Sequence, residues 1–212
     1  MTYALALAAL AFANLLGIIS PGPAFLMVSR AAAGRDLKTA IGLGAGVAIA
    51  ATTWAAMACF GIALLMTHFA PLYGAIQIAG GAYLIWLGIG AWRESRKGPP
   101  APAAAPPQGS VRGGVARAVA TGALISLGNP KIVIFFSSIF VALLPAHAPL
   151  WLRFAVVGIV GVQEVSWYTA VAFVFSRPRV QVAYRRASKW IERGLGTALI
   201  GIGARIVVAA RI

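Results

Sequence analysis

Acidic residues, histidine and cysteine are all scarce in this chain of 212 residues. It contains four Asp and Glu residues, two histidines and one cysteine, Cys59. A single cysteine excludes an intramolecular disulfide and a two-cysteine redox pair. Metal sites in proteins draw on several carboxylate, imidazole or thiolate ligands. The composition therefore predicts no bound metal and no cofactor.

Charge of either sign is also rare, whereas apolar residues are abundant. Charged residues make up 10 % of the chain and hydrophobic residues 60 %, whereas soluble domains carry about 25 % charged residues. Apolar runs near or above the ~18 residues needed to cross a bilayer recur along the sequence, without the alternation typical of membrane β-strands. The sequence therefore predicts an all-α integral membrane protein. The first twenty residues lack a basic n-region, and we expect a retained first helix there, not a signal peptide.

Six apolar segments are expected to span the membrane. Their approximate bounds are 3–28, 40–66, 71–92, 116–144, 151–175 and 190–210. Most basic residues lie in the first, third and fifth intervening segments, and basic loops remain in the cytoplasm. Both termini are therefore predicted to face outward. Topology and anionic lipid head groups account for the net charge of +14, so no nucleic-acid partner is expected.

The chain divides into two similar halves. A Pro/Ala-rich segment at 98–112 is predicted to be a cytoplasmic linker between a repeat at 1–97 and a second repeat at 113–212. IAGGAYLIWLGIGA at 78–91 and IERGLGTALIGIGA at 191–204 share an isoleucine, the glycine three residues later and the closing GIGA. Because each half has three predicted spans, the halves are expected to lie in opposite orientations, as in inverted-repeat transporters.

Glycines spaced four apart predict close helix packing in the second span. Gly42 and Gly46 lie in the run GLGAGVAIA. Small residues at this spacing form one face along which the backbones of membrane helices can approach each other. We expect most of the glycines in the chain to serve packing in this way.

Prolines interrupt the first span of each half. ISPGP at 19–23 places Pro21, Gly22 and Pro23 where a helix should continue, and ISLGNPK at 125–131 repeats the interruption. Proline lacks an amide hydrogen and clashes with the preceding turn, so local unwinding is expected. Freed backbone groups in lipid cost several kcal/mol each unless they are satisfied. These segments are therefore expected to line a cavity, where half-helix ends can hold a carboxylate or a cation; a structural kink is the alternative.

Two charged residues are predicted deep within spans. Lys131 follows the second interruption, and Glu164 lies about midway between Arg153 and Arg177. Ionisable residues at such depth are costly and usually functional. Lys131 is expected to neutralise an anionic substrate group, to pair with a buried carboxylate, or to snorkel to an interface. Glu164 is expected to bind and release a proton or contact substrate, or to form a static pair with Lys131.

Other polar candidates accompany the interruptions. Asn14, Ser20 and Ser126 lie on the two broken helices and either hydrogen-bond between helices or contact a ligand. Asp36 is either a gate at the cytoplasmic mouth or an ordinary loop charge. The predicted substrate-binding residues are Ser20, Pro21, Gly22, Pro23, Ser126, Asn129, Pro130 and Lys131, with Glu164 for proton coupling and Asp36 as the gate.

Several motifs together resemble the LysE/RhtB-type amino-acid exporters. They are the PGP after an apolar first span, the GxGxG at the start of the second, the YLIWLGIGAWR at the end of the third, and the NPK followed by FF in the fourth. The resemblance covers nearly the whole chain. It implies export of amino acids or close derivatives across a bacterial inner membrane, coupled to the proton gradient. The position after PGP is often polar in that family but is Ala24 here, which puts a side-chain contact at this position in doubt.

The leading hypothesis is a secondary amino-acid exporter that works by alternating access. Its partners would be a small amino-acid substrate and membrane lipid, and a homo-oligomer remains open. A divalent metal-ion transporter is the alternative, with only one buried glutamate to support it. A membrane redox enzyme lacks a second thiol, and a hydrolase using Ser20 or Ser126 lacks a nearby base, because His68 and His147 are expected on the outer face. No enzymatic activity is therefore expected.

Overall fold

The computed structural model describes residues 3–20, 22–68, 70–96, 114–145 and 148–209. The described chain is entirely helical outside its turns, so the predicted all-α class is confirmed. The helices are α1 (Tyr3–Ile19), α2 (Pro23–Ala33), α3 (Leu37–His68), α4 (Ala70–Glu94), α5 (Gly114–Leu127), α6 (Pro130–Leu143), α7 (Leu150–Phe175) and α8 (Pro178–Ala209). Pro21 and the predicted linker at 98–112 lie outside the described residues.

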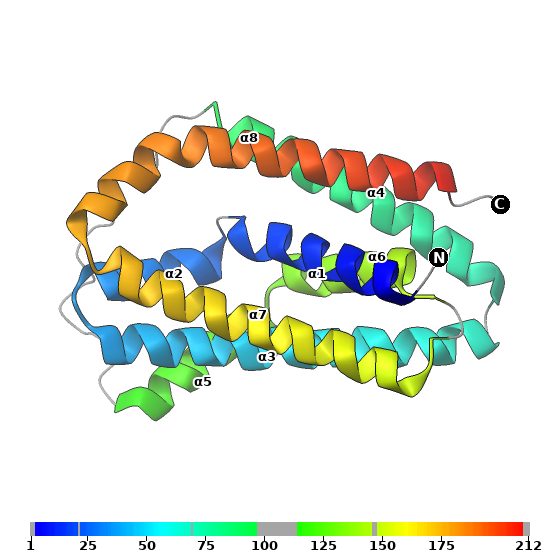
Figure 1. The fold of residues 1–212 in the computed structure, drawn as a ribbon, viewed down its shortest axis with the longest axis horizontal. Helices are drawn as coiled ribbons and strands as arrows, with labels where there is room; N and C mark the ends of the chain where they lie inside the picture. The colour runs from blue at the N-terminus through cyan, green and yellow to red at the C-terminus, as the bar shows by residue number, and fades with distance from the viewer. Residues whose placement is uncertain (1–2, 21, 69, 97–113, 146–147, 210–212) are drawn as a thin grey trace.

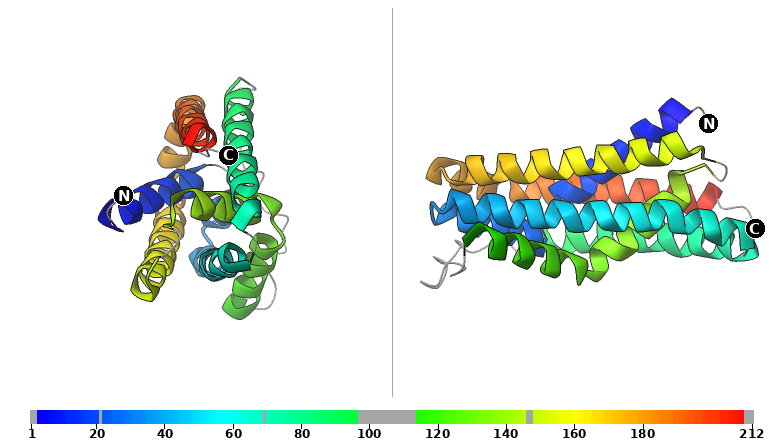
Figure 2. Two further views of the ribbon diagram at one scale, coloured as in Figure 1. Left: turned by 90° about the vertical axis from the view of Figure 1, so that its right-hand side faces the viewer. Right: turned by 90° about the horizontal axis from the view of Figure 1, so that it is seen from below.

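The helices form an elongated bundle and run mostly along its long axis (Figure 1, Figure 2). α1 and α2 together run from one end of the bundle towards the other, α3 returns, and α4 crosses again. The second half follows the same sequence of crossings from the opposite end: α5 with α6, then α7, then α8. The start of α1 and the end of α8 consequently lie at the same end of the bundle.

Both predicted interruptions are present as sharp bends. The axes of α1 and α2 meet at 57°, and those of α5 and α6 at 64°. α2 begins at Pro23 and α6 at Pro130. Proline is favoured in the first turn of a helix because its missing amide hydrogen has no intrahelical acceptor there and its φ angle is already helical. The same residue type that ends one helix therefore starts the next.

Length and composition identify two single helices that can cross a membrane, Leu37–Gly61 within α3 and Leu150–Phe175. The count rises to four if each bent pair is one span. Over the described residues, α4 and α8 do not meet the same criterion, so six spans remain a prediction. The expected loop at 176–189 was wrong, because α8 begins at Pro178 and continues through the basic residues to Ala209.

Glycines bring pairs of helices into close contact. A Cβ atom on Gly203 would lie 2.5 Å from the carbonyl oxygen of Gly81, and one on Gly196 would lie 2.6 Å from that of Gly88. α4 and α8 therefore approach backbone to backbone at two levels. The predicted packing role of Gly46 is also confirmed, because a Cβ there would collide with the α5 backbone.

Candidate functional site

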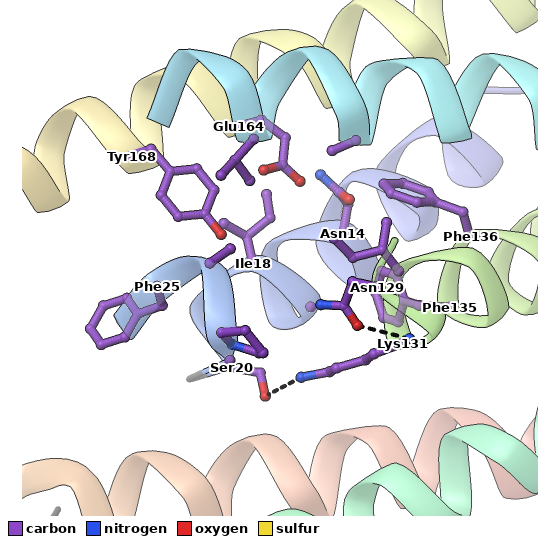
Figure 3. Close-up of a pocket in the computed structure, with 17 residues that line it drawn as sticks. Asn14, Ile18, Ser20, Phe25, Asn129, Lys131, Phe135, Phe136, Glu164 and Tyr168 are labelled. Atoms are coloured by element: carbon purple, nitrogen blue, oxygen red, sulfur yellow. Dashed lines mark hydrogen bonds between the residues drawn. The ribbon is translucent and has the colours of Figure 1, made fainter. Parts of the chain in front are cut away.

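A cavity lies where the two interruptions meet, between α1, α2, α3, α6 and α7 (Figure 3). Its volume is about 60 Å³, enough for about two water molecules. Its polar or charged lining residues are Asn14, Ser20, Asn129, Lys131, Glu164 and Tyr168. Residues of both interruptions therefore line one cavity, and their role in binding stays a prediction.

The second interruption supplies a cation that reaches the first. Asn129 is the N-cap of α6, and its side-chain oxygen accepts a hydrogen bond from the backbone amide of Lys131 at 3.0 Å. The Lys131 ammonium donates to Ser20 Oγ, 3.1 Å away on the other broken helix. Lys131 thus does not snorkel away from the cavity. It lies beside both interruptions.

The first interruption presents the start of α2 to the same cavity. Gly22 is the N-cap, with an extended backbone (φ −139°, ψ −178°) and no side-chain capping bond. A Cβ atom on Gly22 would lie 3.9 Å from Lys131 Nζ, so this helix start and the ammonium are close. The first amide groups of a helix point along its axis without intrahelical partners and carry partial positive charge. This side of the cavity is therefore suited to an anion.

Glu164 faces the cavity from α7. Its side chain is buried, with 5 % of the residue exposed, and Tyr168 lies one turn further along the helix. No ion pair or hydrogen bond joins Glu164 to another residue in the described part of the chain. Figure 3 shows Glu164 and Lys131 at opposite sides of the cavity. The alternative prediction of a static Lys131–Glu164 pair is therefore wrong.

Asn14 is tied to the α7 turn that carries Glu164. Its Nδ2 donates to Gln163 Oε1 at 2.8 Å, and Gln163 Nε2 donates to the carbonyl oxygen of Ala11 at 3.1 Å. The sequence suggested such an interhelical bond for Asn14 but gave no sign of its partner. Sequence analysis also missed Phe135, whose ring packs where a Cβ on Gly17 would otherwise be.

Two predicted residues lie away from the cavity. Ser126 is fully buried, its Oγ has no hydrogen-bond partner, and it is not part of the lining. Asp36 caps α3 by accepting from the Thr39 amide at 3.0 Å. Hydrogen bonds from the Thr39 side chain and backbone lower the pKa of the Asp36 carboxyl. A gating role for Asp36 stays a prediction.

The described residues contain no group of three or more His, Cys, Asp or Glu residues that could hold a metal ion. The metal-transport alternative therefore has no candidate site in this part of the chain. Around the cavity, the polar groups are one ammonium, one carboxyl, side-chain amides, the hydroxyls of Ser20 and Tyr168, and two helix starts.

Sequence comparison assigns this chain to a family. Residues 15–210 match the family of LysE type translocators. The chain is a LysE-family translocator. The resemblance noted from the PGP and NPK motifs is thereby confirmed. The family and the apolar helices point to a protein of the bacterial inner membrane.

Relatives of this translocator carry names that refer to transport or to membranes. The threonine efflux protein of Escherichia coli (strain K12) is 30 % identical over 199 residues, which cover 94 % of this chain and 96 % of that protein. The threonine efflux protein of Salmonella typhi matches with the same identity and coverage. An uncharacterized membrane protein of Haemophilus influenzae is 25 % identical over 194 residues, 92 % of each chain. No solved structure matches this chain.

Proposed function

We propose that this LysE-family translocator exports an amino acid across the inner membrane and binds it in the cavity between the two interruptions. The observation that carries the proposal is the Lys131–Ser20 hydrogen bond beside the uncapped start of α2. A positive charge and a helix start at one place, inside a protein with few charges, are suited to a substrate carboxylate. The relatives named threonine efflux proteins favour a small amino acid.

The size of the cavity sets a requirement on the proposal. At about 60 Å³, the cavity holds a volume equal to about two waters, so an amino acid must displace that water and widen the space. Lys131 would release Ser20 Oγ and turn to the carboxylate. The backbone around the predicted ligand residues Gly22, Pro23, Asn129 and Pro130 would then border this subsite.

Alternating access would follow from an inverted repeat of six spans, with halves at 1–97 and 113–212 joined by the linker at 98–112. Three observations support this part of the proposal. Each half contains one bent helix pair, the two halves cross the bundle in opposite directions (Figure 1), and the corresponding helices α4 and α8 meet through glycines. Since the start of α1 and the end of α8 lie at the same end, both termini would face the periplasm, with the basic turns in the cytoplasm.

Glu164 is proposed as the proton carrier. An unpaired carboxylate is costly to bury. When no substrate is bound, the buried Glu164 carboxyl would therefore hold a proton. A cationic group of the substrate would replace that proton. The charged and titratable groups that face it are Tyr168 on its own helix and Lys131 across the cavity. Exchange of a proton for the substrate at one carboxyl would couple outward movement of the amino acid to inward movement of a proton.

Efflux from proteoliposomes tests this proposal. Vesicles loaded with labelled L-threonine should release it faster when the pH outside is lower than inside, because inward proton movement drives export. In Glu164→Gln, the increase in efflux rate caused by the gradient should be at least about tenfold smaller. The control Glu192→Gln, on α8 and away from the cavity, should keep the full increase. Efflux of wild-type protein that ignores the gradient would remove the coupling, and no efflux of any amino acid would remove the function.

A further inference from the structure

We infer that the carboxamide oxygen of Asn14 and the carboxyl of Glu164 form a subsite for the ammonium group of the substrate. This inference rests on the proposed function and adds an orientation to it. The amine would lie towards α1 and α7, and the carboxylate towards Lys131 and the start of α2. No feature of the PGP or NPK motifs points to Asn14.

The hydrogen bonds fix which end of the Asn14 amide is free. Gln163 donates from Nε2 to the carbonyl oxygen of Ala11 at 3.1 Å, and a carbonyl can only accept. Gln163 Oε1 must therefore face Asn14 as an acceptor, and Asn14 must donate from Nδ2, 2.8 Å away. Asn14 Oδ1 is left over as an acceptor, because any flip of one amide or of both loses at least one of the two bonds.

The free oxygen is buried and lacks a donor. Asn14 is 3 % exposed, and its Oδ1 has no hydrogen-bond partner. A buried acceptor without a partner costs free energy that a suitable donor can recover. Asn14 lines the cavity, so a ligand that widens the cavity around this side chain, as the proposed function requires, can supply that donor. An ammonium group has three N–H donors and no acceptor, which suits a site made of acceptors.

The charges of the cavity are arranged for the same orientation. Figure 3 shows Asn14 and Glu164 on one side and Ser20 with Lys131 on the other. The bond between Asn14 and Gln163, the chain neighbour of Glu164, holds the two acceptors on the same stretch of α1 and α7. A zwitterion placed across the cavity would meet acceptors at its positive end and donors at its negative end, whereas a solute with a carboxylate alone would leave the acceptors unpaired.

Inhibition of L-threonine efflux by two matched solutes tests the inference. One is unlabelled L-threonine, and the other is its 2-hydroxy counterpart, 2,3-dihydroxybutanoate, which keeps the carboxylate but lacks the amine. Wild-type protein should prefer threonine strongly. Asn14→Leu should raise the threonine inhibition constant about tenfold, the size expected for a lost bond to a charged group, and change that of the hydroxy acid less than twofold.

Two further variants separate ligand binding from helix packing. Gln163→Met breaks the tie between α1 and α7 but keeps the Asn14 acceptor, so it should reduce the preference for threonine less than Asn14→Leu does. Asn14→Asp keeps an acceptor at this position even if Asn14→Leu fails to fold, and it should preserve the preference too. Thermal unfolding in detergent identifies any variant that loses activity because it does not fold.

The outcomes are distinguishable. Equal changes for threonine and the hydroxy acid in Asn14→Leu, or unchanged threonine inhibition, would overturn the ammonium subsite and leave a packing amide or a bound water at Asn14. Loss of the preference in Asn14→Asp at full stability would overturn it as well. Failure of wild-type protein to move threonine or any other amino acid would instead contradict the proposed function, before the variants are compared.

Discussion

The two interruptions of this translocator are alike in sequence, but the helices that follow them start with different caps. Both place a proline at the start of the second helix, and their bends are similar, 57° and 64°. The start of α6 is capped by its own Asn129 side chain, whereas the start of α2 at Gly22 has no side-chain cap. One backbone amide at the start of α6 is therefore bonded to Asn129, whereas the amides at the start of α2 have no side-chain acceptor and can bind another group.

Because of this difference, the two halves would contribute different groups to the cavity. The second interruption caps its own helix start and contributes the side chain of Lys131, which reaches Ser20 in the first. The first contributes backbone donors, since Gly22 has no side chain that could take them. An anion that enters the cavity would therefore meet a side-chain charge from one half and a helix start from the other. The following predictions change one side of this comparison at a time.

Removing the charge from the second interruption should have the largest effect. Lys131→Met keeps a long side chain but removes the ammonium beside Ser20. Loss of a buried charge that pairs with a carboxylate costs about 2–5 kcal/mol, so threonine efflux should fall at least about 30-fold. The same exchange at the exposed Lys189 is the matched control and should leave efflux within twofold of wild type. Full efflux from Lys131→Met in proteoliposomes would remove Lys131 from the site.

Giving the first interruption a cap like that of the second should have an intermediate effect. Gly22→Ser fits the extended backbone, and its Cβ would have no contact closer than 3.9 Å. The hydroxyl can accept from the first amides of α2, as serine N-caps do. The helix start would then compete with the substrate, and we expect the KM for threonine to rise about fivefold with an equal or higher Tm.

Gly22→Ala is the control for this change, because it adds the same Cβ atom without an acceptor. Its KM should stay within about twofold of wild type. An equal rise in KM for Ala and Ser would mean that bulk, and not capping, limits binding at this position. An unchanged KM in both variants would argue against the start of α2 as the carboxylate subsite.

Removing the cap from the second interruption should have the smallest effect on transport. Asn129→Ala loses the bond to the Lys131 amide, and loss of such an N-cap costs about 1 kcal/mol of stability. Thermal unfolding should therefore show a Tm lower by a few degrees, while KM changes less than about threefold. Asn129→Asp, which keeps a capping acceptor, should restore the Tm. A large rise in KM with an unchanged Tm would instead make Asn129 a ligand residue.

The sequence was most informative where proline decides the backbone. The helix starts at Pro23 and Pro130 follow from chemistry that acts within a few residues. Their place on a cavity was expected because unsatisfied backbone groups are costly in lipid. The partners of Asn14 and the position of Phe135 over Gly17 could not be predicted, since they depend on how separate helices face each other. The long α8 was missed because hydropathy detects apolar segments, whereas the basic residues after Pro178 are still compatible with a helix.

The central claim is that the amino acid lies between the two interruptions, and cysteine protection tests it most directly. In a Cys59→Ala background, Ser20→Cys places a single thiol in the cavity, and Ser176→Cys places one at the exposed end of α7. The measurement is the rate of methanethiosulfonate modification in proteoliposomes with and without L-threonine. The account predicts that threonine slows modification at position 20 severalfold and leaves position 176 unchanged. Equal rates at position 20 with and without threonine, in protein that still transports it, would contradict the account.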